Sequence, residues 1–231
     1  MALILNIESA TTMCSVALGR DGQLVDVMEV NDGYSHAENL AVFVDEILKK
    51  NQLKVSDLDA IAISEGPGSY TGLRIGVSLA KGLCYGGNVP LISVNTLQQM
   101  CMHPEVVKEL NYRKDGLLCP MLDARRMEVY TAVYDVGLKA ILEPINKILD
   151  ETSYQEFLTT EPVIFFGNGS DKFKEISTNP STYFVADVFP SAVQMIGLSE
   201  MKFQQNQFED VAYFEPFYLK EFQATTPRKL I

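Results

Sequence analysis

The sequence predicts an α/β protein made of two lobes, because the same order of secondary-structure elements occurs twice along its 231 residues. In each half, three apolar segments that are typical of strands come first, and helical and strand patterns then alternate. A composition with 47% hydrophobic and 21% charged residues is that of a globular protein, and it provides a core for one large domain or two small ones.

The first half contains the clearest local signals. Asp21-Gly22 is a hairpin-type turn between two strands. The pattern Ser35-His36-Ala37-Glu38 is a capping box, and apolar residues follow it at the spacing of one helical face. The predicted elements are strands at 3–7, 14–18 and 24–30, a helix whose apolar face is Leu40, Phe43, Val44, Ile47 and Leu48, a strand at 60–63, a helix at 73–85 and a strand at 91–94.

The second half repeats this order with little residue identity to the first. Its predicted elements are strands at 117–122, 128–134 and 140–148, a helix near 154–158, a strand at 163–166, a helix at 172–176, a strand at 183–185 and a helix at 192–204. Residues 100–115, which include His103-Pro104, are the expected boundary between the halves. We therefore expect an N-terminal lobe at 1–105 and a C-terminal lobe at 106–231, whose last residues are candidates for packing back on the first lobe.

Two such lobes match the architecture shared by actin, the sugar kinases and Hsp70, in which the lobes face each other. An analogy of fold does not by itself give a function. The sequence has no run of about eighteen apolar residues, and Glu8 interrupts the apolar N-terminus too early for a signal peptide. We therefore expect a cytoplasmic protein.

Charge and cysteine content argue against two classes of site. The 19 Lys and Arg residues against 30 Asp and Glu give a net charge of -11, which repels phosphate backbones, so contact with nucleic acid needs a more basic partner. The four cysteines are widely spaced in apolar surroundings and form no C-x-x-C pair, which predicts buried reduced thiols rather than disulfides or a zinc site. These cysteines are Cys14, Cys84, Cys101 and Cys119.

Residues 66–76, with the sequence GPGSYTGLRIG, are the strongest local motif. Three glycines and a proline within seven residues indicate special backbone angles where a strand passes into a helix, and Ser69 or Thr71 can cap that helix. A loop before a helix N-terminus can also hold an anion. A tight strand-to-helix turn is favoured, because no Lys follows the glycines as it does in the phosphate-binding loop.

The helix after this motif has apolar residues on all sides, so it is buried either in its own core or by a partner subunit. The small residues Gly72, Gly76, Ala80 and Gly82 would let another helix approach closely. The candidates for a partner surface are Tyr70, Leu73, Arg74, Val77 and Lys81, with Leu40, Val44 and Ile47 on the capped helix. On a partner surface, Val77→Glu would abolish pairing and leave the chain folded, whereas loss of folding would mark Val77 as core.

Three blocks of sequence carry a resemblance to a known family. They are residues 4–10 (ILNIESA), 64–83 (SEGPGSYTGLRIGVSLAKGL) and 122–130 (LDARRMEVY), and 166–169 (FGNG) and 217–220 (FYLK) support them. In this order the blocks closely resemble the bacterial TsaB (YeaZ) family, and in loose form the resemblance covers nearly the whole chain.

The resemblance implies a role in making threonylcarbamoyladenosine at position 37 of tRNAs that read codons beginning with adenosine. In that family a separate synthase makes threonylcarbamoyl-adenylate, and the sibling subunit TsaD transfers the threonylcarbamoyl group to the adenine. TsaB pairs with TsaD through helices near the glycine-rich block, and the ATPase TsaE docks on the pair. The resemblance thus implies a catalytically silent platform that reaches tRNA only through the complex and also self-associates. It implies no cofactor for this chain, with ATP and a metal belonging to the partner subunits.

A metallopeptidase is rejected as an alternative. The catalytic sibling carries an H-x-x-x-H metal motif on a helix, but here Leu40 stands four residues after His36. His103 precedes a proline and has no carboxylate or thiolate pair nearby in the sequence. We therefore predict no metal site.

A nucleotide-binding, kinase-like enzyme is the second alternative. Such a site needs a carboxylate that holds magnesium and a phosphate-binding hairpin after the first strand. Residues 8–11 (ESAT) occupy that place, with Glu8 where the family usually has Asp and without a glycine in the turn. Glu8 is therefore only a weak candidate for nucleotide binding.

The charged turn at residues 123–128 leaves two readings open. The preferred one is a hairpin in which Arg125 and Arg126 pair with the local carboxylates of Asp123 and Glu128. The other is direct contact of these arginines with RNA or a nucleotide.

Overall fold

The computed structural model describes residues 2–33, 36–113 and 116–220. The first of its two sheets has five strands in the spatial order β3 (Gln23–Val30), β2 (Cys14–Arg20), β1 (Leu3–Glu8), β4 (Ala60–Gly66) and β5 (Leu91–Asn95). β1 pairs antiparallel with β2, and β2 with β3, whereas β4 is parallel to both β1 and β5. Every residue of β1 is buried, because helices cover both faces of this sheet.

The second sheet repeats this topology. Its spatial order is β10 (Thr182–Val185), β9 (Val163–Phe166), β6 (Leu117–Asp123), β7 (Glu128–Tyr134) and β8 (Ala140–Ile148). Three antiparallel strands again come first in the chain, and two parallel strands follow on the other side of the first of them. The predicted duplication of two α/β lobes is therefore confirmed in the structure.

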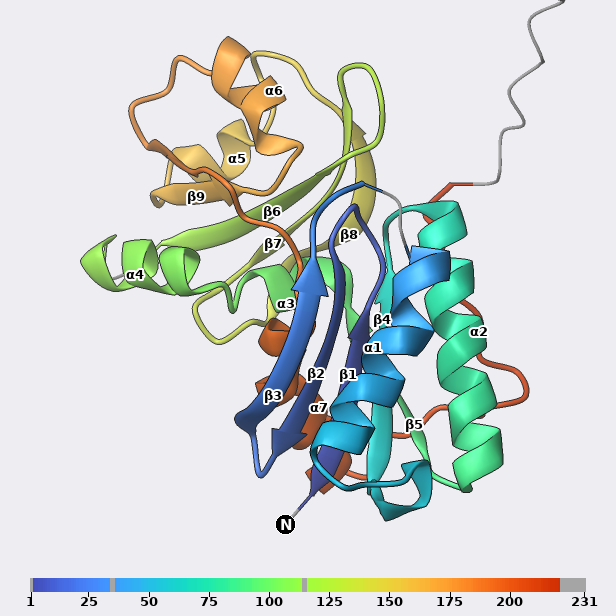
Figure 1. The fold of residues 1–231 in the computed structure, drawn as a ribbon. Coiled ribbons are helices and arrows are strands. Elements are labelled where there is room, and N and C mark those ends of the chain that lie inside the picture. Colours follow the sequence, from blue (N-terminus) through green and yellow to red (C-terminus); the bar gives the residue numbers. More distant parts are fainter. Residues whose placement is uncertain (1, 34–35, 114–115, 221–231) are drawn as a thin grey trace, which may run out of the picture.

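Helices cover the first sheet on both faces (Figure 1). α1 (His36–Lys50) and α2 (Tyr70–Gly87) lie side by side on one face, and a short 3-10 turn (Val55–Asp57) follows α1. Leu3, Leu5 and Ile7 of β1 point to this face, whereas the alternating residue Ile4 packs with α7 (Ala192–Gln204) on the other. β1, β2, β4 and β5 are thus largely buried from both sides, whereas the edge strand β3 is exposed or half-buried.

The helix α7 was predicted as the last element of the second half, yet it packs on the first sheet. Ala192, Met195, Ile196 and Leu198 form a core with the small and branched side chains of that sheet. A buried hydrogen bond from Ser199 Oγ to Asn6 Oδ1 of β1 measures 2.7 Å. The apolar pattern of α7 correctly predicted the helix, but a pattern of this kind does not state which sheet the helix covers.

The second sheet likewise has helices on both faces. α3 (Thr96–Met100) and α4 (Pro104–Arg113) pack on one face, and α5 (Gln155–Leu158) and α6 (Ser170–Ile176) pack on the other. The segment 100–115, predicted as a boundary, is therefore largely helical, and the division at residue 105 falls within α4. Sequence patterns missed α4, a short helix in which only Val106 is fully buried and Leu110 packs beside it partly buried.

The α1 helix is confirmed, while Ser35 of its predicted capping box lies outside the described residues. Five of the eight predicted partner-surface residues belong instead to the core of this chain, which corrects that part of the prediction. Their exposed fractions are 1% for Leu40, 3% for Val44, 0% for Ile47, 0% for Leu73 and 5% for Val77. Leu40, Val44, Ile47 and Val77 fill the layer between the two helices and the sheet, and Leu73 is buried beside Gly66 at the end of β4, so none of the five is accessible to a partner.

The N-terminus of α2 is seated on the loop between β1 and β2, residues 9–13. Ser69 N donates to the Ala10 carbonyl over 2.7 Å, and Ser69 Oγ caps the helix by accepting from Gly72 N. A Cβ atom at Gly68 would lie 2.3 Å from the Ala10 carbonyl oxygen, and one at Gly72 would lie 2.2 Å from that of Ser9. The glycines thus permit a tight strand-to-helix turn, as the favoured reading predicted.

The remaining glycines of α2 differ in their surroundings. A Cβ atom at Gly76 would lie 2.1 Å from Ser9 Oγ, whereas Cβ atoms at Gly82 and Gly86 would meet nothing within 4 Å. Gly72 and Gly76 therefore serve the close approach of the chain's own loop, not that of another helix. Gly82 and Gly86 lie on the exposed side of α2. No helix in the described parts of the chain is long and apolar enough to cross a membrane.

We predict that Val77→Glu unfolds or strongly destabilises the isolated chain. A carboxylate buried without a partner costs about 3–5 kcal/mol, which is a large part of the stability of a typical domain. Urea unfolding followed by circular dichroism measures the change. Ser78→Glu is the matched control, because Ser78 is exposed on the same helix; equal loss of stability in both variants would contradict the assignment of Val77 to the core.

We predict opposite effects of alanine at two glycines of α2. Gly72→Ala forces the new methyl group against the Ser9 carbonyl and should cost about 1–3 kcal/mol through overpacking. Gly82→Ala meets open space and should stabilise the chain by about 0.5–1 kcal/mol, because alanine loses less backbone entropy in a helix. The same urea titration measures both, and a destabilised Gly82→Ala would show that the exposed side of α2 is packed.

Candidate functional site

A cleft of about 720 Å³ lies between the two lobes. Its walls come from the β1–β2 loop, the glycine-rich turn before α2, the hairpin between β6 and β7, and residues 217–220 near the C-terminus. Thr11 and Thr12, Tyr130 and Asn168 contribute polar groups to these walls. All five blocks that carry the family resemblance, at 4–10, 64–83, 122–130, 166–169 and 217–220, therefore contribute residues to one cavity.

The β6–β7 hairpin has an unusual backbone. Arg125 and Arg126 both adopt left-handed angles, with φ of 72° and 49°, in positions where glycine or asparagine is favoured. Asp123 stabilises this turn, because its Oδ1 accepts a hydrogen bond of 2.6 Å from Arg125 N. Ala124 N closes the hairpin by donating to the Glu128 carbonyl. The predicted hairpin is present at this position.

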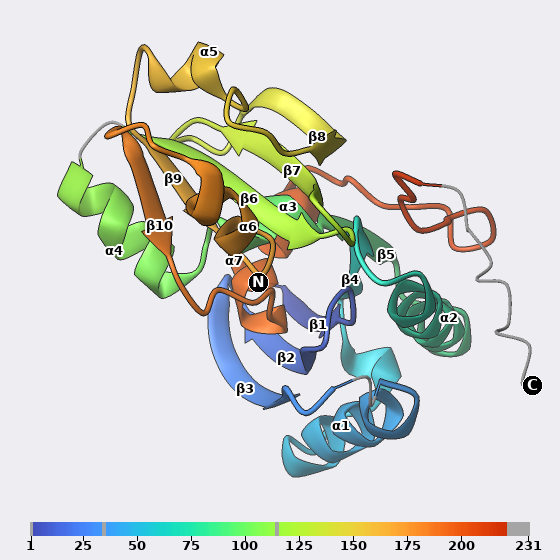
Figure 2. The ribbon, with the colours of Figure 1, turned by 90° about the horizontal axis from the view of Figure 1, so that it is seen from above.

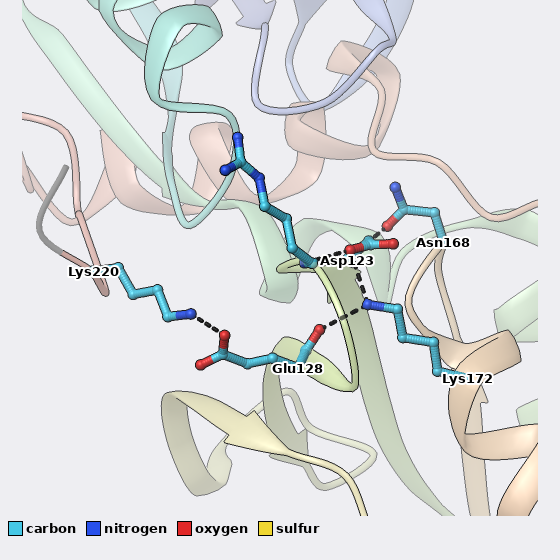
Figure 3. Close-up of polar contacts among 6 residues, drawn as sticks. Asp123, Glu128, Asn168, Lys172 and Lys220 are labelled. Carbon is cyan, nitrogen blue, oxygen red and sulfur yellow. Dashed lines mark hydrogen bonds and ion pairs between the residues drawn. The ribbon is translucent and has the colours of Figure 1, made fainter. Parts of the chain in front are cut away.

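Lysines from distant segments pair with the carboxylates of the hairpin (Figure 3). Lys172 Nζ lies 2.9 Å from Asp123 Oδ1 and also donates to the Glu128 carbonyl, while Lys220 forms an ion pair with the Glu128 carboxylate. Asn168 Oδ1 accepts from Asp123 N over 2.9 Å. The reading in which the arginines pair with these carboxylates is therefore wrong: no ion pair of the described residues contains Arg125 or Arg126.

The charges around the cleft leave one cation without an ionic partner. Asp123 and Lys220 are each paired, and the guanidinium of Arg125 lines the cavity without an ion pair among the described residues. The adjacent Tyr130 has its pKa raised, first by burial and less by the Glu128 carboxylate, while Lys220 opposes the shift. Contact of Arg125 with RNA or a nucleotide stays a prediction.

Glu8 is fully buried and is absent from the lining of the cleft. Its Oε1 accepts a hydrogen bond of 2.5 Å from Ala10 N, and its Oε2 accepts one from Gln99 Nε2. Burial raises the pKa of this carboxyl to about 7, although these hydrogen bonds lower it in part. A carboxyl group in this position is not placed to hold a magnesium ion in the cleft, which corrects the weak prediction of nucleotide binding by Glu8.

The two histidines are separate from each other and from any third ligand group. His36 is 2% exposed, and its Nε2 donates to the Thr11 carbonyl over 2.6 Å. Burial lowers the pKa of His36, and the hydrogen bond to Thr11 opposes the shift. His103 accepts from Glu105 N at the start of α4. Within the described ranges, no group of three or more His, Cys, Asp or Glu residues is arranged to hold a metal.

The four cysteines are free and buried, which confirms their prediction as structural thiols. Burial raises the pKa of Cys14 to about 11 and that of Cys84 to about 12. Cys119 shifts to about 12, mainly by burial, and the pKa of Cys101 is also raised by burial. Thiols of this kind carry little thiolate near neutral pH, so they are poor nucleophiles.

The other three predicted partner-surface residues lie near the surface of α2. Arg74 is exposed and donates to the hydroxyl of Tyr70 over 2.9 Å, while the Tyr70 ring packs with Tyr218 at a centroid distance of 5.1 Å. Lys81 donates to the carbonyls of Ala212 and Phe214 in the chain's own C-terminal segment. Whether any of the three contacts a partner stays a prediction.

α1 and α2 pack side by side, and we call a set of their exposed residues the outer face. Its residues are Ala37, Glu38, Ala41, Val42, Asp45, Glu46, Thr71, Arg74, Ser78, Gly82, Tyr85 and Gly86. Tyr85 is 87% exposed and Val42 is 48% exposed, and sequence reasoning did not select either residue. Both residues lie opposite the buried apolar face of their helix. An apolar residue at such a position is the sequence feature that could have identified them.

The C-terminal segment, residues 205–220, runs from α7 along the edge of the first sheet to the cleft. Glu209 N donates to the Leu91 carbonyl of the edge strand β5, and the Glu209 carboxylate accepts from Ser93 Oγ over 2.6 Å. Farther along, Phe217 N donates to the Glu65 carbonyl over 2.7 Å. The view from above shows this segment passing beside β5 and α2 (Figure 2). It thus connects the edge of the first lobe to the hairpin of the second.

Comparison with known proteins gives consistent matches. The family model for TsaD, described as tRNA N6-adenosine threonylcarbamoyltransferase, matches residues 33–228. The tRNA threonylcarbamoyladenosine biosynthesis protein TsaB of Escherichia coli K12 is 32% identical, with 94% of each chain covered, and that of Haemophilus influenzae is 26% identical over 94% of this chain and 93% of its own length.

Solved structures support the same fold. A Pseudomonas aeruginosa protein described as similar to the peptidase YEAZ has a TM-score of 0.81 at 22% identity, covering 95% of this chain and all of its own. YeaZ from Pseudomonas aeruginosa has a TM-score of 0.74 with the same identity and coverage. The fold, the blocks that meet at the cleft and the near full-length similarity to the Escherichia coli protein lead to one conclusion: this chain belongs to the TsaB family of tRNA threonylcarbamoyladenosine biosynthesis proteins.

Proposed function

We propose that this chain is the non-catalytic subunit of a tRNA threonylcarbamoyl transferase, and that it pairs with and activates a TsaD-type catalytic subunit. The observation that carries the proposal is the outer face of α1 and α2. Val42 is exposed on α1, and Tyr85 is exposed on α2, the helix on which Cβ atoms at Gly82 and Gly86 would meet nothing within 4 Å. Large aromatic residues are enriched in protein interfaces, and small residues let a second helix approach closely.

The match of this chain to the TsaD family model supports the choice of partner. Two chains of one fold can pair through equivalent helices in a pseudo-symmetric arrangement, much as identical chains pair across a two-fold axis. The same surface would serve self-association, so a homodimer competes with the heterodimer. In this proposal a TsaE-type ATPase joins the pair, and ATP and a metal belong to those partner subunits.

The polar groups of the chain support a platform role rather than catalysis. Glu8, His36 and Asp123 all form hydrogen bonds with backbone groups, and Asp123 is also paired with Lys172. Catalytic acids and bases need free access to a substrate proton. The net charge of -11 further supports contact with tRNA through the assembled complex, where a more basic subunit would attract the phosphates.

Reconstitution tests the proposal directly. Threonylcarbamoyl transfer to tRNA is measured with purified synthase, TsaD-type subunit, TsaE-type ATPase and ATP, with and without this chain. We expect activity that requires the chain, and none from the chain alone. Full activity in its absence would contradict the platform role and favour a nucleotide-dependent enzyme with a substrate of its own.

A glycine-to-arginine substitution tests the outer face, with the same substitution at a glycine outside this face as the control. We expect Gly82→Arg to weaken pairing with the TsaD-type subunit at least tenfold, because a long charged side chain would stand where a helix must approach. Gly197→Arg on α7 is the matched control, since a Cβ atom there also meets nothing within 4 Å but lies on the opposite side of the first sheet. Calorimetry measures affinity, and circular dichroism verifies folding. Equal affinities of the two variants would place the contact elsewhere.

A further inference from the structure

The C-terminal segment, residues 205–220, is anchored to the first lobe along most of its length. Glu209 N donates to the Leu91 carbonyl of the edge strand β5 over 2.8 Å. Farther along, Val211 and Phe214 pack against the core that lies between the first sheet and its helices α1 and α2. Backbone hydrogen bonds and buried apolar side chains thus hold this part of the segment together.

The anchored part of the segment ends at Phe217, which lies against the end of β4. Phe217 N donates to the Glu65 carbonyl over 2.7 Å. The backbone of the segment comes so close to Gly66 that a Cβ atom there would lie 2.6 Å from the Phe217 carbonyl oxygen. Gly66 also has a φ of 115°, which favours glycine. The first lobe is therefore built to receive the segment up to this residue.

The next residues pass from the first lobe to the second. Tyr218 packs with Tyr70 of α2 at a centroid distance of 5.1 Å, and residues 217–220 line the cleft. Lys220 then forms an ion pair with Glu128 at the start of β7 (Figure 3). Among the residues that the structure describes, this pair is the one hydrogen bond or ion pair between the segment and the second lobe.

The second lobe holds Glu128 in place from its own side. Lys172 Nζ of α6 donates to the Glu128 carbonyl over 3.0 Å and pairs with Asp123 on the same hairpin. Asn168 adds a hydrogen bond to the hairpin, because its Oδ1 accepts from Asp123 N. The Glu128 carboxylate is therefore a fixed acceptor. If its pair with Lys220 breaks, the end of the segment is the part that moves.

The contact with the second lobe is weaker than the anchors on the first. The side chain of Lys220 is 32% exposed and that of Glu128 is 19% exposed. An ion pair with this access to water is screened by salt and shifts a local equilibrium by only about two- to fivefold. The anchors at residues 209–217 combine several hydrogen bonds with apolar burial. The ion pair is therefore the first contact of the segment to open.

We propose that residues 205–220 form a strap between the two lobes, and that the Lys220–Glu128 ion pair is its catch. While the catch is closed, residues 217–220 form one wall of the cleft. When it opens, residues 218–220 swing away and the cleft opens on that side, while the strap stays anchored as far as Phe217.

Nothing else that joins the lobes replaces this wall. The helix α3 packs against strands of both sheets and against α7, but neither helix contributes a residue to the cleft. The junction made by these helices therefore keeps the lobes together whether the catch is open or closed. The strap is also independent of the proposed pairing with a TsaD-type subunit, since none of its contacts requires a partner.

The chain contains no tryptophan, which allows a fluorescence test at a single site. Tyr218→Trp introduces the probe next to the catch. In this background we expect Lys220→Glu to raise the acrylamide quenching constant about twofold, because two carboxylates then face each other and expel the end of the strap. The charge swap of Lys220→Glu with Glu128→Lys should restore the starting value. Lys108→Glu, which reverses a charge in an exposed ion pair of α4, is the matched control and should change nothing.

Salt provides a second prediction in the same fluorescence assay. Raising sodium chloride from about 0.05 M to 1 M should increase quenching in the Tyr218→Trp chain, because it screens the attraction that closes the catch. In Lys220→Glu the same change should decrease quenching, because it screens a repulsion. A salt response of equal sign and size in the two chains would overturn the catch.

Amide hydrogen exchange tests the strap without the tryptophan. In Lys220→Glu we expect the protection factor of Phe217 N–H to fall about fivefold, while that of Glu209 N–H, which is bonded to β5, stays unchanged. Circular dichroism verifies the folding of every variant. Unchanged protection of Phe217, or a folded charge swap in which quenching stays high, would overturn the catch. An equal fall at Glu209 would overturn the anchored strap, since the whole segment would then detach.

Discussion

The close approach of the glycine-rich turn to the β1–β2 loop is the constraint on which the rest of the structure depends. β1 and β4 are parallel neighbours, so both strands end at the same edge of the sheet, where backbone carbonyls of one loop meet the N-terminus of α2. No side chain fits between Ser9 or Ala10 and the glycines at 68 and 72. This contact sets the direction of α2. α2 in turn packs against α1, contributes one wall of the cleft, and binds the C-terminal segment through Lys81.

Local patterns in the sequence were sufficient for most of the fold. Alternating and helical apolar spacings predicted the strands of both sheets and the helices α1, α2 and α7, and the repeated order predicted the duplication. The patterns did not reveal α4, whose burial rests largely on Val106, or the sheet on which α7 packs. The sheet against which a helix packs depends on residues far away in the sequence. A short stretch of sequence therefore does not reveal it.

The candidate site was less predictable, for two physical reasons. The ion pairs of Asp123 and Glu128 join residues 49 and 92 positions apart, so adjacent arginines were the wrong choice of partner. The outer face was predicted only in part, through Arg74 and Gly82, because hydrophobicity marks the buried side of a helix. Leu73 and Val77 are core, while the exposed stripe contains Ser78 and Gly82, which apolar spacing does not detect.

The position of α7 has a consequence for how the chain folds during synthesis. The helix that covers one face of the first sheet, and the segment that borders β5, are both made after the whole second lobe. A growing chain that has completed its first five strands therefore carries an apolar face that nothing yet covers. Such a face is prone to aggregation until the last part of the chain leaves the ribosome. The two lobes repeat one topology, but the first lobe is completed only after the second has been made.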